Sequence, residues 1–311
     1  MQYSVDVILL TYKPSQETLE LIRRLESQTY SVNKIIIMNT EERYFEKLFY
    51  GKGFLEHYPN IEVHHISARE FDHAGTRRRA VEKYSSTDIF VCMTQDAVPA
   101  NENLIRALVA ALKSQEDTAA AYARQLARED CREIERFTRK FNYPAQPSVK
   151  SREDIQKLGV KAFFCSNVCA AYDRRIYDGL GGFEKRAVFN EDMIYAGHAV
   201  KAGKKIAYAA EAKVIHSHNF TCMQQLRRNF DLGVSQSDHP EVFEGISSES
   251  EGTRLVADTA RHLWETKHKK LIPYLFVSSG FKYAGYRLGK AYRRLPGRLA
   301  VWCSSNKNYW Q

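Results

Sequence analysis

Residues 5–11 read VDVILLT and decide the fold. An almost unbroken apolar run of this length is typical of a parallel strand that is buried on both faces. Pro14 then marks the start of a helix in which Leu19, Ile22 and Leu25 recur at helical spacing. The stretch therefore predicts a β-strand followed directly by an α-helix.

The same alternation of strand and helix continues through the first hundred residues. Apolar runs predict further strands at residues 34–38, 61–66 and 88–93, and a helix follows Gly75. Repeated units of this kind form a doubly wound sheet. We therefore expect residues 1–100 to be the nucleotide-binding half of an α/β domain.

Residues 101–239 are expected to complete the same domain. Their patterns indicate a helix at 101–113 and a strand at 117–122, followed by a loop or lid at 124–161. Ordered structure is expected to resume at 162–172 and to continue with a short helix and a turn at 180–183. A helix from Glu191 to Gly203 and a short strand at 213–215 follow. From about Pro240 the chain is helical and basic, without a strand signal. We expect residues 240–311 to form a helical C-terminal appendage.

Charge and composition narrow the class of partner and the compartment. The net charge of +9 and the pI of about 9.1 favour an anionic partner, which can be nucleic acid, anionic lipid or a phosphorylated substrate. The six cysteines include no CxxC pair, which predicts reduced thiols in a cytoplasmic protein. The N-terminus does not resemble a signal peptide, and the apolar run at 271–277 is too short to span a bilayer. Any membrane contact is therefore expected to be peripheral.

Polar residues follow three of the predicted strands. Thr11 and Tyr12 follow the first, Asn39 the second, and Gln95 and Asp96 the fourth. Ligands of parallel α/β sheets bind at these strand ends, although polar turn residues occur there in any case. A carboxylate in the position of Asp96 can bind Mg²⁺ or Mn²⁺ against a diphosphate.

Three further groups are candidates for chemistry. Asp72 and Arg77 belong to the start of a helix whose free N–H groups can meet phosphate oxygens, although every basic helix has such a start. Asp192 lies in the first turn of another helix, as a general base or simply as an acid favoured there by the helix dipole. Strand alternation places His216 and His218 on one face, where they form a structural pair or one of them completes a metal site with Asp96.

Six ordered motifs resemble those of family-2 glycosyltransferases of GT-A fold. They read FDHAGTR at 71–77, TQDAVP at 94–99, FCSNVCAAY at 164–172, LGGF at 180–183, NED at 190–192 and HSHN at 216–219. Within that family they are similar to bacterial rhamnosyltransferases that use thymidine-diphosphate rhamnose, and the resemblance covers roughly residues 4–235. It implies a mixed central sheet flanked by helices, with residues 101–239 as the acceptor-side half of the domain.

The resemblance also implies roles for individual residues. Asp96 stands in the family's Asp-x-Asp metal motif, Asp192 at the catalytic base and His218 at a C-terminal metal ligand. Two positions depart from the family pattern. Thr94 replaces the first acid of Asp-x-Asp, which weakens the inference of a metal, and Asn39 stands where many relatives carry a base-recognising aspartate.

These roles predict an inverting transfer of L-rhamnose from dTDP-L-rhamnose to a hydroxyl of a lipid-linked bacterial surface glycan. Mg²⁺ or Mn²⁺ is the expected cofactor, and the enzyme is expected in the cytoplasm, at the inner face of the cytoplasmic membrane. The residues expected to bind the donor are Thr11, Tyr12, Asn39, Asp72, Arg77, Gln95 and Asp96. UDP-galactofuranose and UDP-hexosamine remain alternative donors. A non-catalytic carbohydrate- or nucleic-acid-binding protein is the alternative of another class, but clustered carboxylates would repel nucleic acid.

The C-terminal appendage contains one amphipathic helical pattern. Its apolar face would carry Phe281, Ala284, Leu288, Ala291, Tyr292 and Leu295, and its basic face Lys282, Arg287, Lys290, Arg293 and Arg294. Such a helix can lie on an anionic membrane, or it can pack against the catalytic domain or a second copy of the chain. Gly285 and Gly289 weaken it as an isolated helix.

Overall fold

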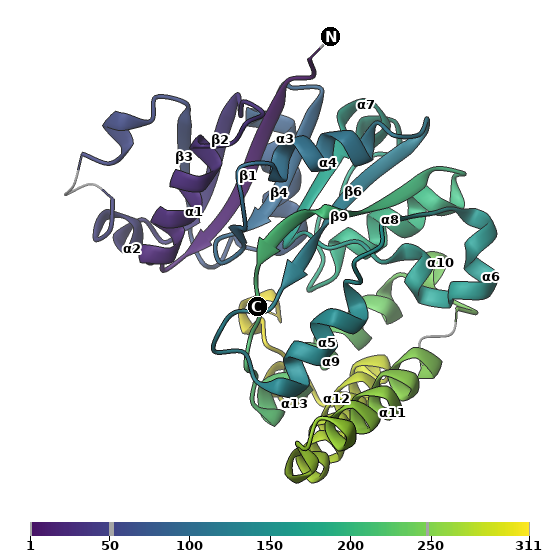
Figure 1. The fold of residues 1–311 in the computed structure, drawn as a ribbon. Helices are drawn as coiled ribbons and strands as arrows, with labels where there is room; N and C mark the ends of the chain where they lie inside the picture. The colour runs from purple at the N-terminus through teal and green to yellow at the C-terminus, as the bar shows by residue number, and fades with distance from the viewer. Residues whose placement is uncertain (1, 50–52, 247–248, 311) are drawn as a thin grey trace.

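A nine-stranded mixed sheet forms the centre of the molecule (Figure 1). The computed structural model describes residues 2–49, 53–246 and 249–310. The strands are β1 (Val5–Tyr12), β2 (Lys34–Thr40), β3 (Ile61–Ile66), β4 (Ile89–Thr94), β5 (Val98–Pro99), β6 (Thr118–Leu126), β7 (Ser148–Lys150), β8 (Cys169–Asp173) and β9 (Lys205–Ile215). Their order is β3-β2-β1-β4-β8-β6-β9-β5, and β7 pairs with β9.

The first half of the sheet is parallel, as predicted. Leu9 of β1 lies opposite Ile37 of β2 on one side and Met93 of β4 on the other. Side chains of β1 enter two separate cores in alternation, with Ile8 packed on one face of the sheet and Leu9 on the other. This double burial is why the strand reads as a continuous apolar run.

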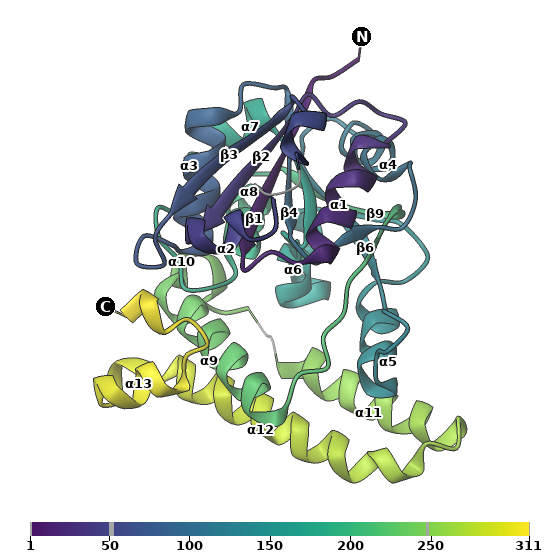
Figure 2. The ribbon, with the colours of Figure 1, turned by 90° about the vertical axis from the view of Figure 1, so that its left-hand side faces the viewer.

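Helices cover both faces of the sheet (Figure 2). One face carries α1 (Gln16–Glu26) and α4 (Leu104–Leu112), and the other carries α3 (His73–Tyr84), α7 (Arg174–Gly179) and α8 (Glu191–Lys201). The shorter elements are α2 (Glu42–Glu46), α6 (Ile155–Leu158), α10 (Pro240–Phe243) and the 3-10 turns Leu55–His57, Arg152–Asp154, Gly159–Phe163, Lys269–Leu271, Tyr292–Arg294 and Lys307–Trp310.

The prediction of a loop or lid at residues 124–161 is wrong. This segment contains the end of β6, all of β7, α6 and the helix α5 (Glu133–Asn142). The helix α5 contacts α11 (Glu249–Glu265), because His262 of α11 stacks on Phe137 at 4.6 Å and its Nε2 lies 2.8 Å from the Glu133 carboxylate. The apolar residues Ile134, Phe137 and Phe141 recur at helical spacing, so the prediction of a loop overlooked a local helix signal. The short strand predicted at 213–215 is likewise only the end of the longer β9.

A layer of helices lies beneath the sheet, on the side away from the N-terminus (Figure 2). It consists of α9 (Cys222–Asp238), α11 (Glu249–Glu265), α12 (Ile272–Lys290) and α13 (Gly297–Cys303). Helical structure therefore begins earlier than the predicted Pro240, and the domain boundary at 239/240 stays a prediction. No helix of the described residues is both long enough and apolar enough to cross a membrane.

Glycines allow α12 to lie directly on α9. A Cβ atom on Gly285 would stand 2.1 Å from the carbonyl oxygen of Leu226, and one on Gly289 would stand 2.1 Å from that of Phe230. The side chains of Leu288, Tyr292 and Leu295 pack against the Phe230 cluster, which is the packing expected for part of the predicted apolar face. The glycines that weaken α12 in isolation are thus the residues that allow its close packing.

Candidate active site

The polar residues predicted at the strand ends lie together at the carboxyl ends of β1, β2 and β4. Thr11 Oγ1 donates a hydrogen bond to Asn39 Oδ1 at 3.0 Å. The backbone N–H of Tyr12 donates to Gln95 Oε1 at 3.0 Å, and Gln95 Nε2 donates back to the Tyr12 carbonyl at 2.8 Å. These bonds join the ends of β1, β2 and β4 and leave the ring of Tyr12 exposed beside Tyr44, at 5.6 Å. The exposed ring offers a flat apolar surface at the edge where a nucleotide base is expected.

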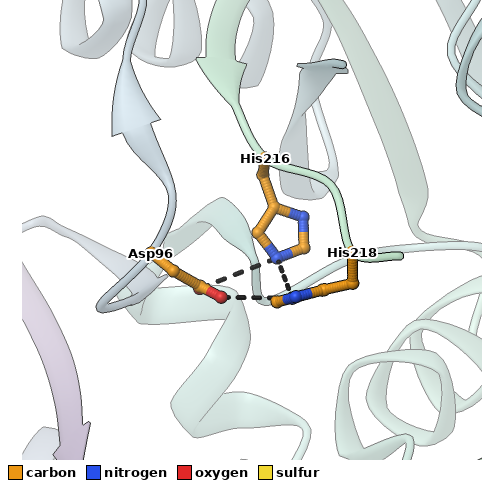
Figure 3. Close-up of side chains that lie close together, drawn as sticks. All are labelled: Asp96, His216 and His218. Atoms are coloured by element: carbon orange, nitrogen blue, oxygen red, sulfur yellow. Dashed lines mark hydrogen bonds and ion pairs between the residues drawn. The ribbon is translucent and has the colours of Figure 1, made fainter. Parts of the chain in front are cut away.

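Three potential metal ligands converge next to this edge (Figure 3). The Nε2 atom of His218 lies 3.1 Å from Asp96 Oδ2 and 3.1 Å from His216 Nε2, and His216 Nε2 lies 3.6 Å from Asp96 Oδ1. Asp96 follows β4, whereas both histidines follow β9, so the sheet itself sets their spacing. One carboxylate and two imidazoles that face a common point suit a divalent transition ion such as Mn²⁺.

The surroundings of Asp96 and His216 shift both pKa values toward the forms that bind a metal. Burial raises the pKa of the Asp96 carboxyl, but hydrogen bonds and charge from His216 and His218 outweigh it and hold that pKa well below its usual range. Burial lowers the pKa of His216, which favours the neutral imidazole. His216 Nδ1 lies 3.0 Å from Gln125 Oε1, so an Nδ1–H there leaves the Nε2 lone pair directed at the cluster.

The Asp192 carboxyl is held at the start of α8. Its Oδ2 accepts a hydrogen bond from the backbone N–H of Asn167 at 2.7 Å, and its Oδ1 accepts one from that of Met193 at 2.8 Å. Burial, and then the negative charge of Glu191, raise the pKa of Asp192 to about 7. A carboxylate with a pKa near neutrality can take up a proton from a hydroxyl at physiological pH.

A buried ion pair lies next to the Asp192 carboxyl. Arg77 of α3 and Glu191 of α8 are both buried, with 2.6 Å between the guanidinium and the carboxylate. Glu191 also accepts a hydrogen bond from Asn167 Nδ2 at 2.9 Å, and Asn167 Oδ1 accepts one from Tyr172 at 2.7 Å. Asn167 therefore ties the ion pair to Asp192, because its side chain binds Glu191 while its backbone binds Asp192.

The structure gives Asp72 and Arg77 contacts within the protein. Asp72 caps α3 by accepting a hydrogen bond from the Gly75 N–H at 2.8 Å, and it also accepts one from the N–H of Ala187 at 3.3 Å. The guanidinium of Arg77 is directed at Glu191 and is 2% exposed. Asp72 therefore stabilises the start of α3, and Arg77 connects α3 to α8. A direct contact of either side chain with the nucleotide-sugar donor stays a prediction.

Four residues of the site were absent from the predicted set. His216 lies in the HSHN motif, where strand alternation places it on the same face as His218. Glu191 lies in the NED motif, in the first turn of the same helix as Asp192. Both residues could therefore have been predicted. Gln125 and Asn167 act from a strand and a loop far away in sequence, and no spacing indicated them.

Comparisons with known proteins identify the family. Residues 6–181 match the sequence model of Glycosyl transferase family 2. The chain is 33% identical over 309 residues to the O-antigen chain rhamnosyltransferase RfbN of Salmonella typhimurium, which covers 98% of this chain and 96% of that protein. It is 38% identical over 248 residues to the O-antigen chain rhamnosyltransferase WbaN of Salmonella anatum, and this match covers 79% of this chain and 78% of that protein.

A solved structure shows the same fold. The mannosyltransferase PcManGT from Pyrobaculum calidifontis aligns with a TM-score of 0.58 and 14% identity, over 100% of this chain and 85% of that one. This likeness confirms the predicted GT-A fold with its mixed sheet and flanking helices. The chain is a glycosyltransferase and belongs to Glycosyl transferase family 2.

Proposed function

We propose that this enzyme transfers L-rhamnose from dTDP-L-rhamnose to a hydroxyl of a lipid-linked O-antigen chain, a bacterial surface polysaccharide. The observation that carries the choice of sugar is the 33% identity to a protein named as an O-antigen chain rhamnosyltransferase, which extends over 98% of the chain. A second relative of the same description supports it. The site contains what such a transfer needs, namely a near-neutral carboxyl and a cluster of metal ligands.

Asp192 is the proposed general base. Its carboxylate accepts the proton of the acceptor hydroxyl while that oxygen attacks the anomeric carbon of the donor. The bond from the anomeric carbon to the diphosphate oxygen breaks in the same step, so that nucleoside diphosphate leaves and the anomeric configuration inverts. Asn167 and the Arg77–Glu191 pair keep the carboxylate in place and maintain its raised pKa.

The Asp96, His216 and His218 side chains are the proposed ligands of Mg²⁺ or Mn²⁺. The bound ion would stabilise the negative charge that develops on the leaving diphosphate. Two imidazoles favour Mn²⁺ over Mg²⁺, because Mg²⁺ prefers oxygen ligands. The aligned mannosyltransferase was solved with GDP-Man and Mn²⁺, which supports this assignment.

The nucleoside would lie along the ends of β1, β2 and β4. The exposed Tyr12 and the partly exposed Gln95 are the proposed contacts for the base. Thr11 and Asn39 are buried and bonded within the protein, because Asn39 Oδ1 accepts a hydrogen bond from Thr11 and Asn39 Nδ2 lies 3.0 Å from His65 Nδ1. Their proposed part in donor binding is therefore to fix the ends of β1 and β2.

A panel of donors tests the choice of sugar. Purified enzyme is incubated with lipid-linked acceptor and dTDP-L-rhamnose, UDP-galactofuranose or a UDP-hexosamine, and the release of nucleoside diphosphate is measured. We expect turnover with dTDP-L-rhamnose and at least about tenfold less with the others, because a site built to bind one sugar leaves polar groups unpaired with another. Preferred turnover of either UDP-sugar would refute the rhamnose assignment.

We also propose that the helical layer docks on the cytoplasmic face of an anionic membrane, where a lipid-linked acceptor would be presented. Most of the exposed large apolar side chains of the described residues belong to this layer. They are Trp264, Tyr274, Phe276, Val277, Phe281, Tyr283, Leu299 and Trp302. By helical spacing Phe276 and Tyr283 lie on α12 opposite the glycines that face α9. This unburied apolar face replaces the face predicted from the sequence.

Cations border that apolar surface at both ends of α12. Lys269 lies 3.8 Å over the ring of Trp264, before the helix begins. At its other end, Arg287 and Lys290 of the last turn and Arg293 and Arg294 just after it line a hollow of about 370 Å³. Exposed aromatic rings between cations are typical of surfaces that bind anionic lipid headgroups, where each nearby cation contributes about 1 kcal/mol.

Sedimentation with vesicles tests the docking. The enzyme is expected to bind vesicles that contain anionic lipid, to bind neutral vesicles poorly, and to be released by high salt. Glutamine at positions 287, 290, 293 and 294 should reduce binding about tenfold or more. A matched variant with glutamine at four exposed cations elsewhere, Lys47, Arg69, Arg152 and Lys157, should bind like the parent. Equal binding of the two variants would show that total charge, and not this surface, controls attachment.

A further inference from the structure

The side-chain amide of Gln125 has a partner at every hydrogen-bonding position. Gln125 lies on β6 and is 3% exposed. Its Oε1 lies 3.0 Å from His216 Nδ1 and accepts a hydrogen bond from the guanidinium of Arg139 on α5. Its Nε2 donates to the Tyr143 hydroxyl at 2.6 Å and to Ser166 Oγ at 3.1 Å. A buried amide with these contacts is held in one place and in one orientation.

Arg139 decides which end of the amide faces His216. A guanidinium carries only N–H donors, so the end of the amide beside Arg139 must be the oxygen. With the amide turned over, two donors would oppose each other. Arg139 is itself fixed, because its Nε donates to Glu135 Oε1 at 2.7 Å, one turn earlier in α5, and this pair is largely buried. The group that His216 meets on Gln125 is therefore a carbonyl oxygen.

This oxygen fixes the position of the proton on the neutral imidazole. It can only accept a hydrogen bond, so His216 Nδ1 carries the hydrogen and Nε2 keeps its lone pair. That lone pair lies on the side of Asp96 and His218, where the candidate ligand atoms meet (Figure 3). In the other tautomer an N–H would point into the metal site, and a nitrogen that carries a hydrogen cannot bind a metal ion.

The charge of Asp96 favours the wrong tautomer. Asp96 Oδ1 lies 3.6 Å from His216 Nε2, so the carboxylate attracts a proton to the nitrogen that a metal ion needs. Arg139 and Gln125 act from the opposite side of the ring and oppose this attraction. In the wrong tautomer, the Nδ1 lone pair would face the lone pairs of the Gln125 oxygen at 3.0 Å. Removal of that oxygen should therefore let the proton move to Nε2.

We propose that Gln125, oriented by Arg139, is a positioning residue that keeps the His216 proton on Nδ1 and so leaves Nε2 free to bind the metal ion. The proposal rests on the proposed function only in that the cluster holds a divalent ion. It does not depend on which nucleotide sugar the enzyme uses. Neither Gln125 nor Arg139 needs to touch the substrates for this role.

Nuclear magnetic resonance of the metal-free protein tests the tautomer directly. The chain is labelled with ¹⁵N-histidine, the signals of His216 are identified by their loss in H216Q, and long-range ¹H–¹⁵N correlations show which nitrogen carries the hydrogen. At mildly alkaline pH we expect Nδ1–H in the parent and a gain of the Nε2–H form in Q125M, because methionine offers no oxygen. R139M should show a smaller gain, since the amide is then free to turn. Q125E should keep Nδ1–H, because a carboxylate accepts hydrogen bonds from both His216 and Arg139.

Binding of Mn²⁺, followed by electron paramagnetic resonance, measures the consequence in the same proteins. Q125M should bind Mn²⁺ about tenfold or more weakly, which is the loss typical of a partner that orients a metal-binding histidine. Q125E should bind Mn²⁺ nearly as the parent does. Q115M makes the same replacement at an exposed glutamine and should match the parent in both measurements.

Two results would overturn the proposal. An unchanged tautomer together with unchanged Mn²⁺ affinity in Q125M would show that Gln125 does not control His216. Equal losses of Mn²⁺ affinity in Q125M and Q125E, with Nδ1–H retained in both, would assign Gln125 to packing around Tyr143 alone. A parent that binds no Mn²⁺ would instead refute the proposed metal site itself, so the two failures are distinct.

Discussion

Replacing Asp192 with asparagine is expected to lower kcat by about 10²- to 10⁴-fold, the contribution typical of a general base. The amide has the size of the carboxylate but cannot accept the proton of the attacking hydroxyl. Donor affinity should stay nearly unchanged, because Asp192 acts on the acceptor. Single-turnover rates with saturating donor, together with TDP affinity, measure the two effects separately.

The pH dependence of the parent provides a second measure of the same carboxyl. Its pKa of about 7 means that the base is protonated, and inactive, below that pH. We expect kcat/KM to fall about tenfold per pH unit below pH 7 and to level off above it. The exposed Asp178 serves as a control, since D178N should keep the rate and the pH profile of the parent. Retention of most turnover in D192N would remove Asp192 from the role of base.

Replacing Asp96 with alanine is expected to give the second large loss, about 10²- to 10³-fold in kcat/KM. This is the scale on which enzymes lose activity when a group that stabilises developing charge is removed. The carboxylate is the anionic member of the proposed metal site, and without it two neutral imidazoles hold a divalent ion weakly. Binding of Mn²⁺ followed by electron paramagnetic resonance should weaken in parallel, independently of turnover.

The histidines of the cluster distinguish a metal site from a structural contact. H218A should weaken Mn²⁺ binding as D96A does, whereas alanine at the exposed His57 should leave it unchanged. Undiminished activity of the parent in an excess of chelator would contradict the metal role. Basic side chains would then have to stabilise the charge of the diphosphate without a metal ion.

Local sequence patterns predict most of the fold because the signals of a parallel α/β sheet are local. The run VDVILLT is apolar because both of its faces are buried, and this can be read without knowing what covers them. The helix α5 also has a local signal in Ile134, Phe137 and Phe141 at helical spacing, but its packing partner α11 could not be predicted, because it lies more than a hundred positions away. Gly285 and Gly289 likewise weaken an isolated helix and become favourable only where α9 approaches.

The site could be predicted in part for the same reason. Asp96 and Asp192 follow a strand and begin a helix, positions that are visible in the sequence. Arg77 also lies near a helix start, but its guanidinium turns inward because Glu191, 114 residues later, is placed beside it by the sheet. The direction of a long side chain depends on tertiary contacts. His216 and Asn167 acquire their roles from the same spatial arrangement.

The proposed transfer is a single displacement at the anomeric carbon, with Asp192 as base. The most direct test is the anomeric configuration of the product, determined by nuclear magnetic resonance after transfer from a donor of known configuration. We expect the new glycosidic bond to have the configuration opposite to that of the donor. A product that retains the donor's configuration would exclude a single displacement.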